Sequence, residues 1–120
     1  MDPFRVFVFY HLGFDEHYQY KFRNIHDTAR AFRTTPEALN EFLTRHGMDP
    51  TTFRHIDFNL AVAHADAQIL DLDARPLDER ERFARRKYEE FRAALKTYRK
   101  DRTFEDIDYD DPLGLDKRRR

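Results

Sequence analysis

The side chains best suited to metal binding lie between positions 57 and 68 of this sequence. Asp57, His64 and Gln68 are spaced by seven and then four residues, which would place them on one face of a helix. Two ligands one turn apart are a common beginning of a metal site, but here the partner of the histidine is only a glutamine. The sequence has no HExxH motif. We therefore expect no metal site and no cofactor. A metal-dependent enzyme built on His64 and Asp57 is the weakest of the three functions that we consider for this sequence.

The residues that nucleophilic catalysis needs are missing. The sequence contains no serine and no cysteine, which excludes Ser-His-Asp and Cys-His mechanisms. Its glycines are far apart, so no glycine-rich loop could hold a nucleotide phosphate. The densest carboxylate group lies in a stretch with no predicted scaffold, and general acid–base catalysis needs a rigid one. That group is Asp106, Asp108, Asp110 and Asp111. We expect no catalytic residue.

The composition is that of one globular domain. The chain has 120 residues, 40% of them hydrophobic, with 12 Phe and 6 Tyr, enough to form a core. No apolar run is long enough to cross a bilayer, and the first residues do not resemble a signal peptide. We expect a soluble, cytoplasmic protein with no membrane partner, whose residues 1–102 form a single compact domain.

A net charge of −1 conceals strong charge patterning. Residues 56–74 carry four acids and no Lys or Arg, whereas residues 75–102 carry eleven bases against six acids. We take the bases of this second stretch as the candidate interaction surface, with a solvated helix face that forms ordinary i,i+4 ion pairs as the alternative. The candidate residues are Arg82, Arg85, Arg86, Arg92, Lys96 and Arg99.

The N-terminal pattern predicts a β-hairpin over residues 4–23. Residues 4–10 are almost all β-branched or aromatic, and in residues 17–23 aromatic and polar side chains alternate. The turn is expected around residues 13–16. The alternating aromatics Tyr18, Tyr20 and Phe22 could also stack on nucleic-acid bases, but core packing is the preferred interpretation.

The rest of the chain predicts four helices, at about 25–33, 36–46, 50–70 and 76–100. Asn24, Thr35-Pro36 and Asp49-Pro50 supply capping side chains or first-turn prolines. So many apolar residues lie in 50–70 that this helix is expected to be central and most buried. Residues 76–100 carry a heptad-like seam typical of a peripheral helix or an oligomer contact. Residues 103–120 are expected to form an extended or disordered charged tail, and the predicted fold class is α+β.

One segment resembles a known family of DNA-binding proteins. Within "IHDTARAFRTTPEALNEFLTRHGMD", residues 25–49, Ala29 fits the small residue where two helices cross, and Leu39 and Phe42 fit buried positions of the second helix. Residues 25–44 are thus similar to the helix-turn-helix family, with Arg33 where glycine is usual. The resemblance implies contacts to nucleic-acid bases from Asn40, Thr44 and Arg45.

The charge of that second helix disfavours DNA. Its outward positions carry two acids, Glu37 and Glu41, against one base, and a polyanion is bound mainly through basic side chains. We therefore predict a non-enzymatic protein–protein interaction or adaptor domain. It would act through the basic helix, the acidic tail or a homodimer formed by the hairpin. The alternative is a helix-turn-helix regulator that binds nucleic acid.

Overall fold

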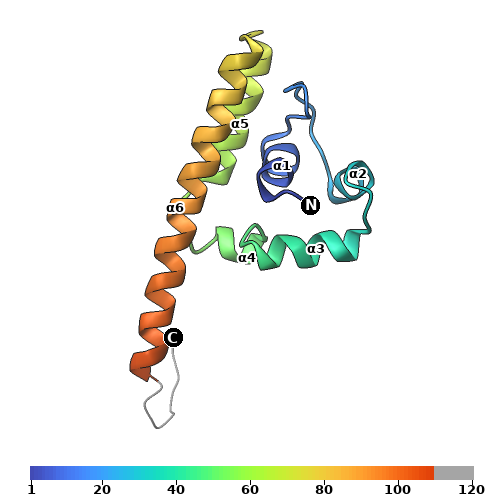
Figure 1. The fold of residues 1–120 in the computed structure, drawn as a ribbon. Helices are drawn as coiled ribbons and strands as arrows, with labels where there is room; N and C mark the ends of the chain where they lie inside the picture. The colour runs from blue at the N-terminus through green and yellow to red at the C-terminus, as the bar shows by residue number, and fades with distance from the viewer. Residues whose placement is uncertain (110–120) are drawn as a thin grey trace.

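The computed structural model describes residues 1–109, with side chains up to residue 100, and it is helical (Figure 1). Its elements are α1 (Pro3–Val6), the π-helix η1 (Phe7–Leu12), α2 (Ile25–Ala31), α3 (Pro36–Arg45), α4 (Pro50–Phe53), α5 (Leu60–Leu72) and α6 (Leu77–Tyr109). Residues 1–109 contain no strand, and only an isolated antiparallel bridge joins Phe14 to Tyr20. The predicted β-hairpin over 4–23 and the α+β fold class are therefore wrong.

The N-terminal segment is helical because its first residues cap a helix. The Asp2 carboxylate accepts a hydrogen bond from the Phe4 amide at 3.0 Å, and Pro3 occupies the first turn. The helix is then buried on all sides, which removes the polar–apolar periodicity that marks a surface helix. Its fully buried side chains are Val6, Phe7, Val8 and Leu12. Gly13 ends η1 in the left-handed conformation, with φ of 87°.

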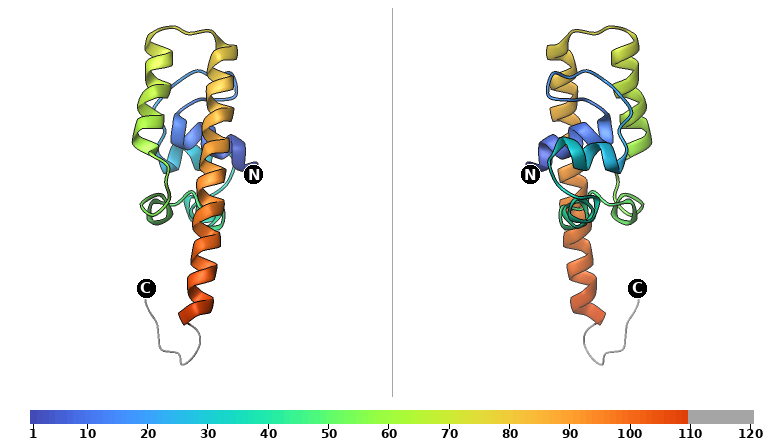
Figure 2. Two further views of the ribbon diagram at one scale, coloured as in Figure 1. Left: turned by 90° about the vertical axis from the view of Figure 1, so that its left-hand side faces the viewer. Right: turned by 90° about the vertical axis from the view of Figure 1, so that its right-hand side faces the viewer.

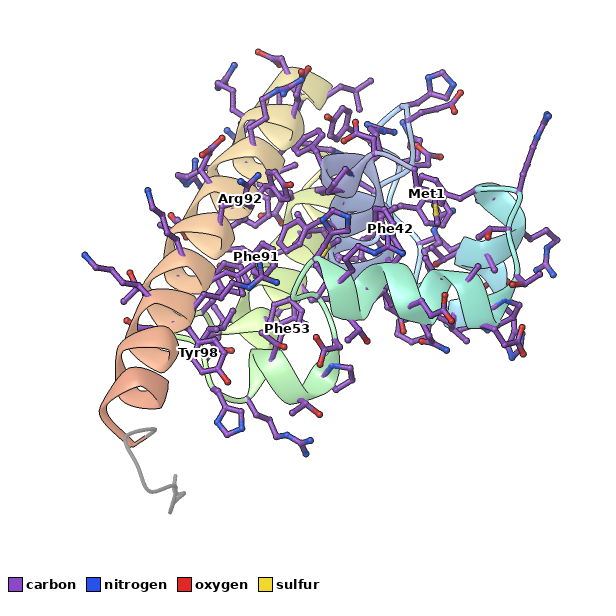
Figure 3. All side chains as sticks on the ribbon, turned by 60° about the horizontal axis from the view of Figure 1, so that its bottom comes forward. Met1, Phe42, Phe53, Phe91, Arg92 and Tyr98 are labelled. Atoms are coloured by element: carbon purple, nitrogen blue, oxygen red, sulfur yellow. The ribbon has the colours of Figure 1, made fainter. Side chains whose placement is uncertain are left out.

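The helices form layers around this N-terminal helix. Figure 1 shows α1 between the α5–α6 hairpin on one side and the α2–α3 pair on the other, and η1 contacts α2, α5 and α6. Phe7 of η1 stacks on Phe91 of α6 with ring centroids 5.1 Å apart. Figure 3 shows Phe91 and Phe53 gathered between α6 and α4, with Tyr98 farther along α6. The N-terminal helix, rather than residues 50–70, is the centre of the core.

The helix predicted over 50–70 is interrupted at residues 54–59. Ile56 is buried and Phe58 packs on Phe7 and Phe91, so residues only two positions apart both reach the core. A helix would direct such a pair to opposite faces. Asn59 then starts α5 by accepting a hydrogen bond from the Val62 amide at 3.0 Å. The result is a short α4 and a separate α5 at the edge of the body.

Helix α6 is longer than predicted. It runs to Tyr109, so residues 103–109 are helical and not an extended tail. The sequence has no glycine or proline between Pro76 and Pro112 that would end the helix. Figure 2 shows this helix extending beyond the other elements. The predicted tail residues 110–120 lie outside the described residues. In the described part of the chain, no helix is both long enough and apolar enough to cross a bilayer.

The seam predicted on the last helix is used within the chain. Ala84, Phe91 and Leu95 are buried, and Tyr88 and Tyr98 are partly buried against the same core. Phe91 packs on Phe7 and Phe53, and Tyr98 stacks on His55, so these seam residues contact other elements of the same chain.

Candidate functional site

An open, mainly apolar pocket lies between η1, the loop 13–24, α3, α4 and α5. Its volume is about 590 Å³, within the range of small-molecule sites. It is lined by Tyr10, His11, Phe22, Arg23, Asn24, Ile25, Asn40, Leu43, Met48, Pro50, Phe53, Leu60, Ala61 and His64. No Asp or Glu is among these residues. We call this surface the histidine pocket.

A chain of hydrogen bonds fixes both histidines of the pocket. The Tyr20 hydroxyl lies 2.6 Å from His64 Nε2, and His64 Nδ1 lies 2.9 Å from the carbonyl oxygen of His11. Since a carbonyl can only accept, His64 carries its proton on Nδ1 and the Tyr20 hydroxyl donates to Nε2. Burial and then the Asp71 carboxylate raise the pKa of Tyr20, which keeps this donor protonated.

His11 has one nitrogen bonded to protein and one that is not. Its Nε2 donates to the Met48 carbonyl oxygen at 3.0 Å, which leaves Nδ1 as a bare acceptor in the neutral ring. The ring is surrounded by the rings of Phe7, Tyr10 and Phe53. Burial lowers the pKa of His11 to about 4, so the ring is neutral near pH 7. Among the described residues, no partner hydrogen-bonds to His11 Nδ1 or to the Tyr10 hydroxyl.

An exposed apolar stripe continues from the pocket along α5. Val62, Ile69 and Leu72 are 51%, 50% and 72% exposed, and Ala65 between them is exposed as well. Their spacing of three, four and three residues places them on one helix face. The opposite face packs on the body through Ala63 and Ala67. Figure 2 shows α5 at the edge of the body, with no described helix on its outer side. We call these four residues the α5 stripe.

One side of the α5 stripe is acidic. Asp66 on α5 and Asp73 at its C-cap follow Val62 and Ile69 by four residues, and neither forms an ion pair with a described residue. The two charges lie about one helical turn from the stripe on the same flank. A large apolar patch edged by charge is typical of a protein-binding surface.

Two of the six predicted interaction residues form ordinary surface ion pairs. Arg82 pairs with Asp78 at 2.9 Å and Arg85 with Glu81 at 3.0 Å, each four residues apart on α6. Arg86 lies over the Phe83 ring with its Cζ 5.5 Å from the centroid. The charges of Arg82 and Arg85 are thus largely used within α6.

The other three predicted residues gather at one hollow. Arg92, Lys96 and Arg99 line an open hollow of about 430 Å³ on α6. Arg99 Nη2 donates to the Arg45 carbonyl at 3.2 Å. Burial and then the charges of Arg45, Arg99 and Arg92 lower the pKa of His46, which shows that these bases are close together. Glu89 also lines the hollow, so its charge is mixed.

The helix-turn-helix segment has a tight turn between α2 and α3. Arg33 adopts a positive φ of 56°, the conformation usual for glycine, and the Thr34 amide donates to the Ala29 carbonyl at 2.9 Å. The three proposed base contacts are all exposed on α3, with Thr44 one turn from Asn40. Asn40 lines the histidine pocket, whereas the backbone of Arg45 meets α6. Thr44 is exposed on the ridge that also carries Glu37 and Glu41.

The residues considered for metal binding do not come together. Asp57 lies in the loop 54–59 rather than on the helix of His64, and both ring nitrogens of His64 are hydrogen-bonded. In the part of the chain that was searched, no group of three His, Asp or Glu could hold a metal ion. Of the three aromatics considered for base stacking, Tyr18 is buried and Tyr20 bonds His64, whereas Phe22 is exposed.

Sequence reasoning missed Tyr10 and His11 as site residues, and it considered Tyr20 only for base stacking. A useful signal was present, because His11 is a titratable residue inside a segment that is otherwise apolar. A polar group that the fold must bury is more informative than an exposed apolar one. Comparison of the chain with family models, curated proteins and solved structures finds no match.

Proposed function

We propose that this chain is a non-enzymatic interaction module that binds an amphipathic helix of another protein along the α5 stripe. The observation that supports this is the apolar character of α5 on both faces. One face packs on the other helices of the chain, while the side chains of Val62, Ile69 and Leu72 on the outer face remain at least half exposed. Apolar residues at i, i+3, i+7 and i+10 are the pattern with which two helices pack side by side.

The charges around the stripe favour a basic partner. Residues 56–74 contain Asp57, Asp66, Asp71 and Asp73 and no Lys or Arg. Asp71 is already paired with Arg80 at 3.0 Å, and Arg75, near Asp73, is paired with Glu79 at 2.9 Å, so Asp66 and Asp73 remain as acids beside the stripe. A partner helix with Lys or Arg flanking its apolar face would pair with them, and one with Glu would be repelled.

The hydrogen bonding of the histidine pocket supports a binding role. The His64 ring is hydrogen-bonded on both sides, to the Tyr20 hydroxyl and to the backbone carbonyl of His11, so neither of its nitrogens is left to act as a base toward a substrate. The lack of cysteine is consistent with the reducing cytoplasm, where we propose that the module works.

The test uses two designed helical peptides of about three heptads with Leu and Ile at the seam positions. One carries Lys and the other Glu at the flanking positions, and each is titrated with the full chain by fluorescence anisotropy. We expect the Lys peptide to bind at least about tenfold more tightly than the Glu peptide. Ile69→Asp should abolish this binding, and Thr97→Asp, at an exposed position of α6, should leave it unchanged.

Two results would count against the proposed partner. If Ile69→Asp and Thr97→Asp bind the Lys peptide equally, the α5 stripe is not the docking surface. If the wild-type chain sediments as a dimer that Ile69→Asp dissociates, the stripe is occupied by a second copy instead of a basic helix.

A further inference from the structure

The histidine pocket is a separate feature from the α5 stripe, and the two meet only at the start of α5. Ala61 lines the pocket, while Val62 and Ala65 belong to the outer face of the helix. A partner helix on the stripe would pack on the exposed outer face of α5, whereas the pocket is a concavity of about 590 Å³. A volume of this size fits a small molecule.

The charge of the pocket selects an uncharged ligand. No carboxylate lines it, so a cation would lose its hydration without gaining a counter-charge. Its guanidinium, Arg23, is engaged elsewhere: it lies 4.4 Å over the Phe9 ring and donates to the carbonyls of Lys21 and Gln19. An anion would therefore find no free cation, since His11 is neutral near pH 7.

The lining also selects the shape and one polar group of the ligand. Phe22, Phe53, Tyr10 and His11 bring rings to the pocket, and rings pack best on other flat rings. His11 is partly buried, and its Nδ1 is an acceptor with no partner among the described residues, so a ligand that excludes water from the pocket must supply a donor to it. A donor on the ligand would satisfy it.

We propose that the histidine pocket binds an uncharged aromatic molecule that carries a hydroxyl or N–H group, which donates a hydrogen bond to His11 Nδ1. The Tyr10 hydroxyl and the Asn40 carboxamide at the pocket wall are further polar groups for the ligand. The Tyr20–His64 bond holds the wall beside Phe22 in place. This site does not depend on the helix-binding function proposed above.

The experiment uses 2-naphthol as the probe and 2-methoxynaphthalene, which has no donor, as the matched probe. Both are titrated into the ¹⁵N-labelled full chain, and amide and imidazole ¹⁵N resonances are recorded. We expect 2-naphthol to bind at least about tenfold more tightly, because a site that pairs a donor rejects the analogue without it. We also expect the unprotonated ¹⁵N resonance of His11 to shift upfield as it accepts the hydrogen bond.

Two variants locate the binding. Ala61→Trp fills the pocket from α5, and Gln68→Trp places the same side chain two turns on, at an exposed position that lies neither in the pocket lining nor in the α5 stripe. Ala61→Trp should remove 2-naphthol binding and Gln68→Trp should preserve it, with dispersed amide spectra showing that both variants fold. Equal binding of the two probes, an unmoved His11 resonance or equal binding by the two variants would each overturn the proposal.

Discussion

Removal of the Arg80 guanidinium should destabilise the fold far more than removal of an exposed arginine on the same helix. Arg80 is 6% exposed and joins three segments through hydrogen bonds of 3.0 Å. Its Nε donates to the Arg75 carbonyl, and its Nη1 donates to the Tyr18 carbonyl and to Asp71 Oδ1. It thereby fixes the loop 13–24, which carries Tyr20 and Phe22 of the pocket region, to the α5–α6 hairpin.

The magnitude follows from these three bonds. A hydrogen bond to a charged group contributes about 1.5 to 3 kcal/mol, and breaking a buried pair costs about 3 to 5 kcal/mol. The Asp71 side chain is 34% exposed, so water can partly replace its lost partner. We therefore expect Arg80→Met to lower the free energy of unfolding by about 3 kcal/mol.

Arg82→Met is the matched control for this experiment. Arg82 pairs with Asp78 at 2.9 Å on the exposed side of α6, where solvent screening leaves such a pair little effect on stability. Urea unfolding followed by circular dichroism gives both free energies, and similar m-values would show that the same surface unfolds. If Arg80→Met is no less stable than Arg82→Met, the three bonds do not hold the loop and the reasoning is refuted.

Two further predictions concern His11 and Gly47. The pKa of His11 is lowered from 6.5 to about 4, so the unfolded chain binds the proton first, and stability falls as the pH decreases from 6.5 to about 4. In His11→Phe, the free energy of unfolding should lose about 3 kcal/mol of its change over this pH range, as measured by unfolding curves at each pH. Parallel pH profiles of the wild type and the variant would contradict this. Gly47 has φ of 73°, and a Cβ there would lie 2.6 Å from Leu95 Cδ1, so Gly47→Ala should cost about 2 kcal/mol or more in thermal unfolding. Ala74→Gly, at φ of 52°, is the control and should be neutral or stabilising; an equal loss in both variants would rule out the local explanation.

Capping residues in the sequence marked most of the helix starts. One of them, at the start of α1, was present in the sequence, but the segment was predicted to be a strand. Thr35 and Asp49 each cap a helix whose first residue is proline, as expected. Asp2-Pro3 is the same signal and caps α1. The strand prediction gave more weight to the β-branched and aromatic residues that follow. A helix buried on all sides needs such residues everywhere, so composition alone could not distinguish it from a strand.

The histidine pocket could not be predicted in the same way. Its lining comes from five separated segments, and its hydrogen bonds join residues 37, 44 and 53 positions apart in sequence. Helical periodicity relates residues only within one element. The α5 stripe was partly visible, since Val62 and Ile69 belong to the apolar-rich residues 50–70. That they remain exposed depends on which elements cover α5, which is a tertiary property.

The π-helical form of η1 makes the length of the N-terminal segment important in its own right. A π-helical turn contains one residue more than the α-helical turn it replaces, as if a residue had been inserted. Deleting Val8 would allow the segment to return to α-helical register and would rotate everything after it by about 100°. His11 would leave the pocket wall and its carbonyl would leave His64, although every residue of the site would still be present. Chain length, and not only residue identity, therefore specifies this site.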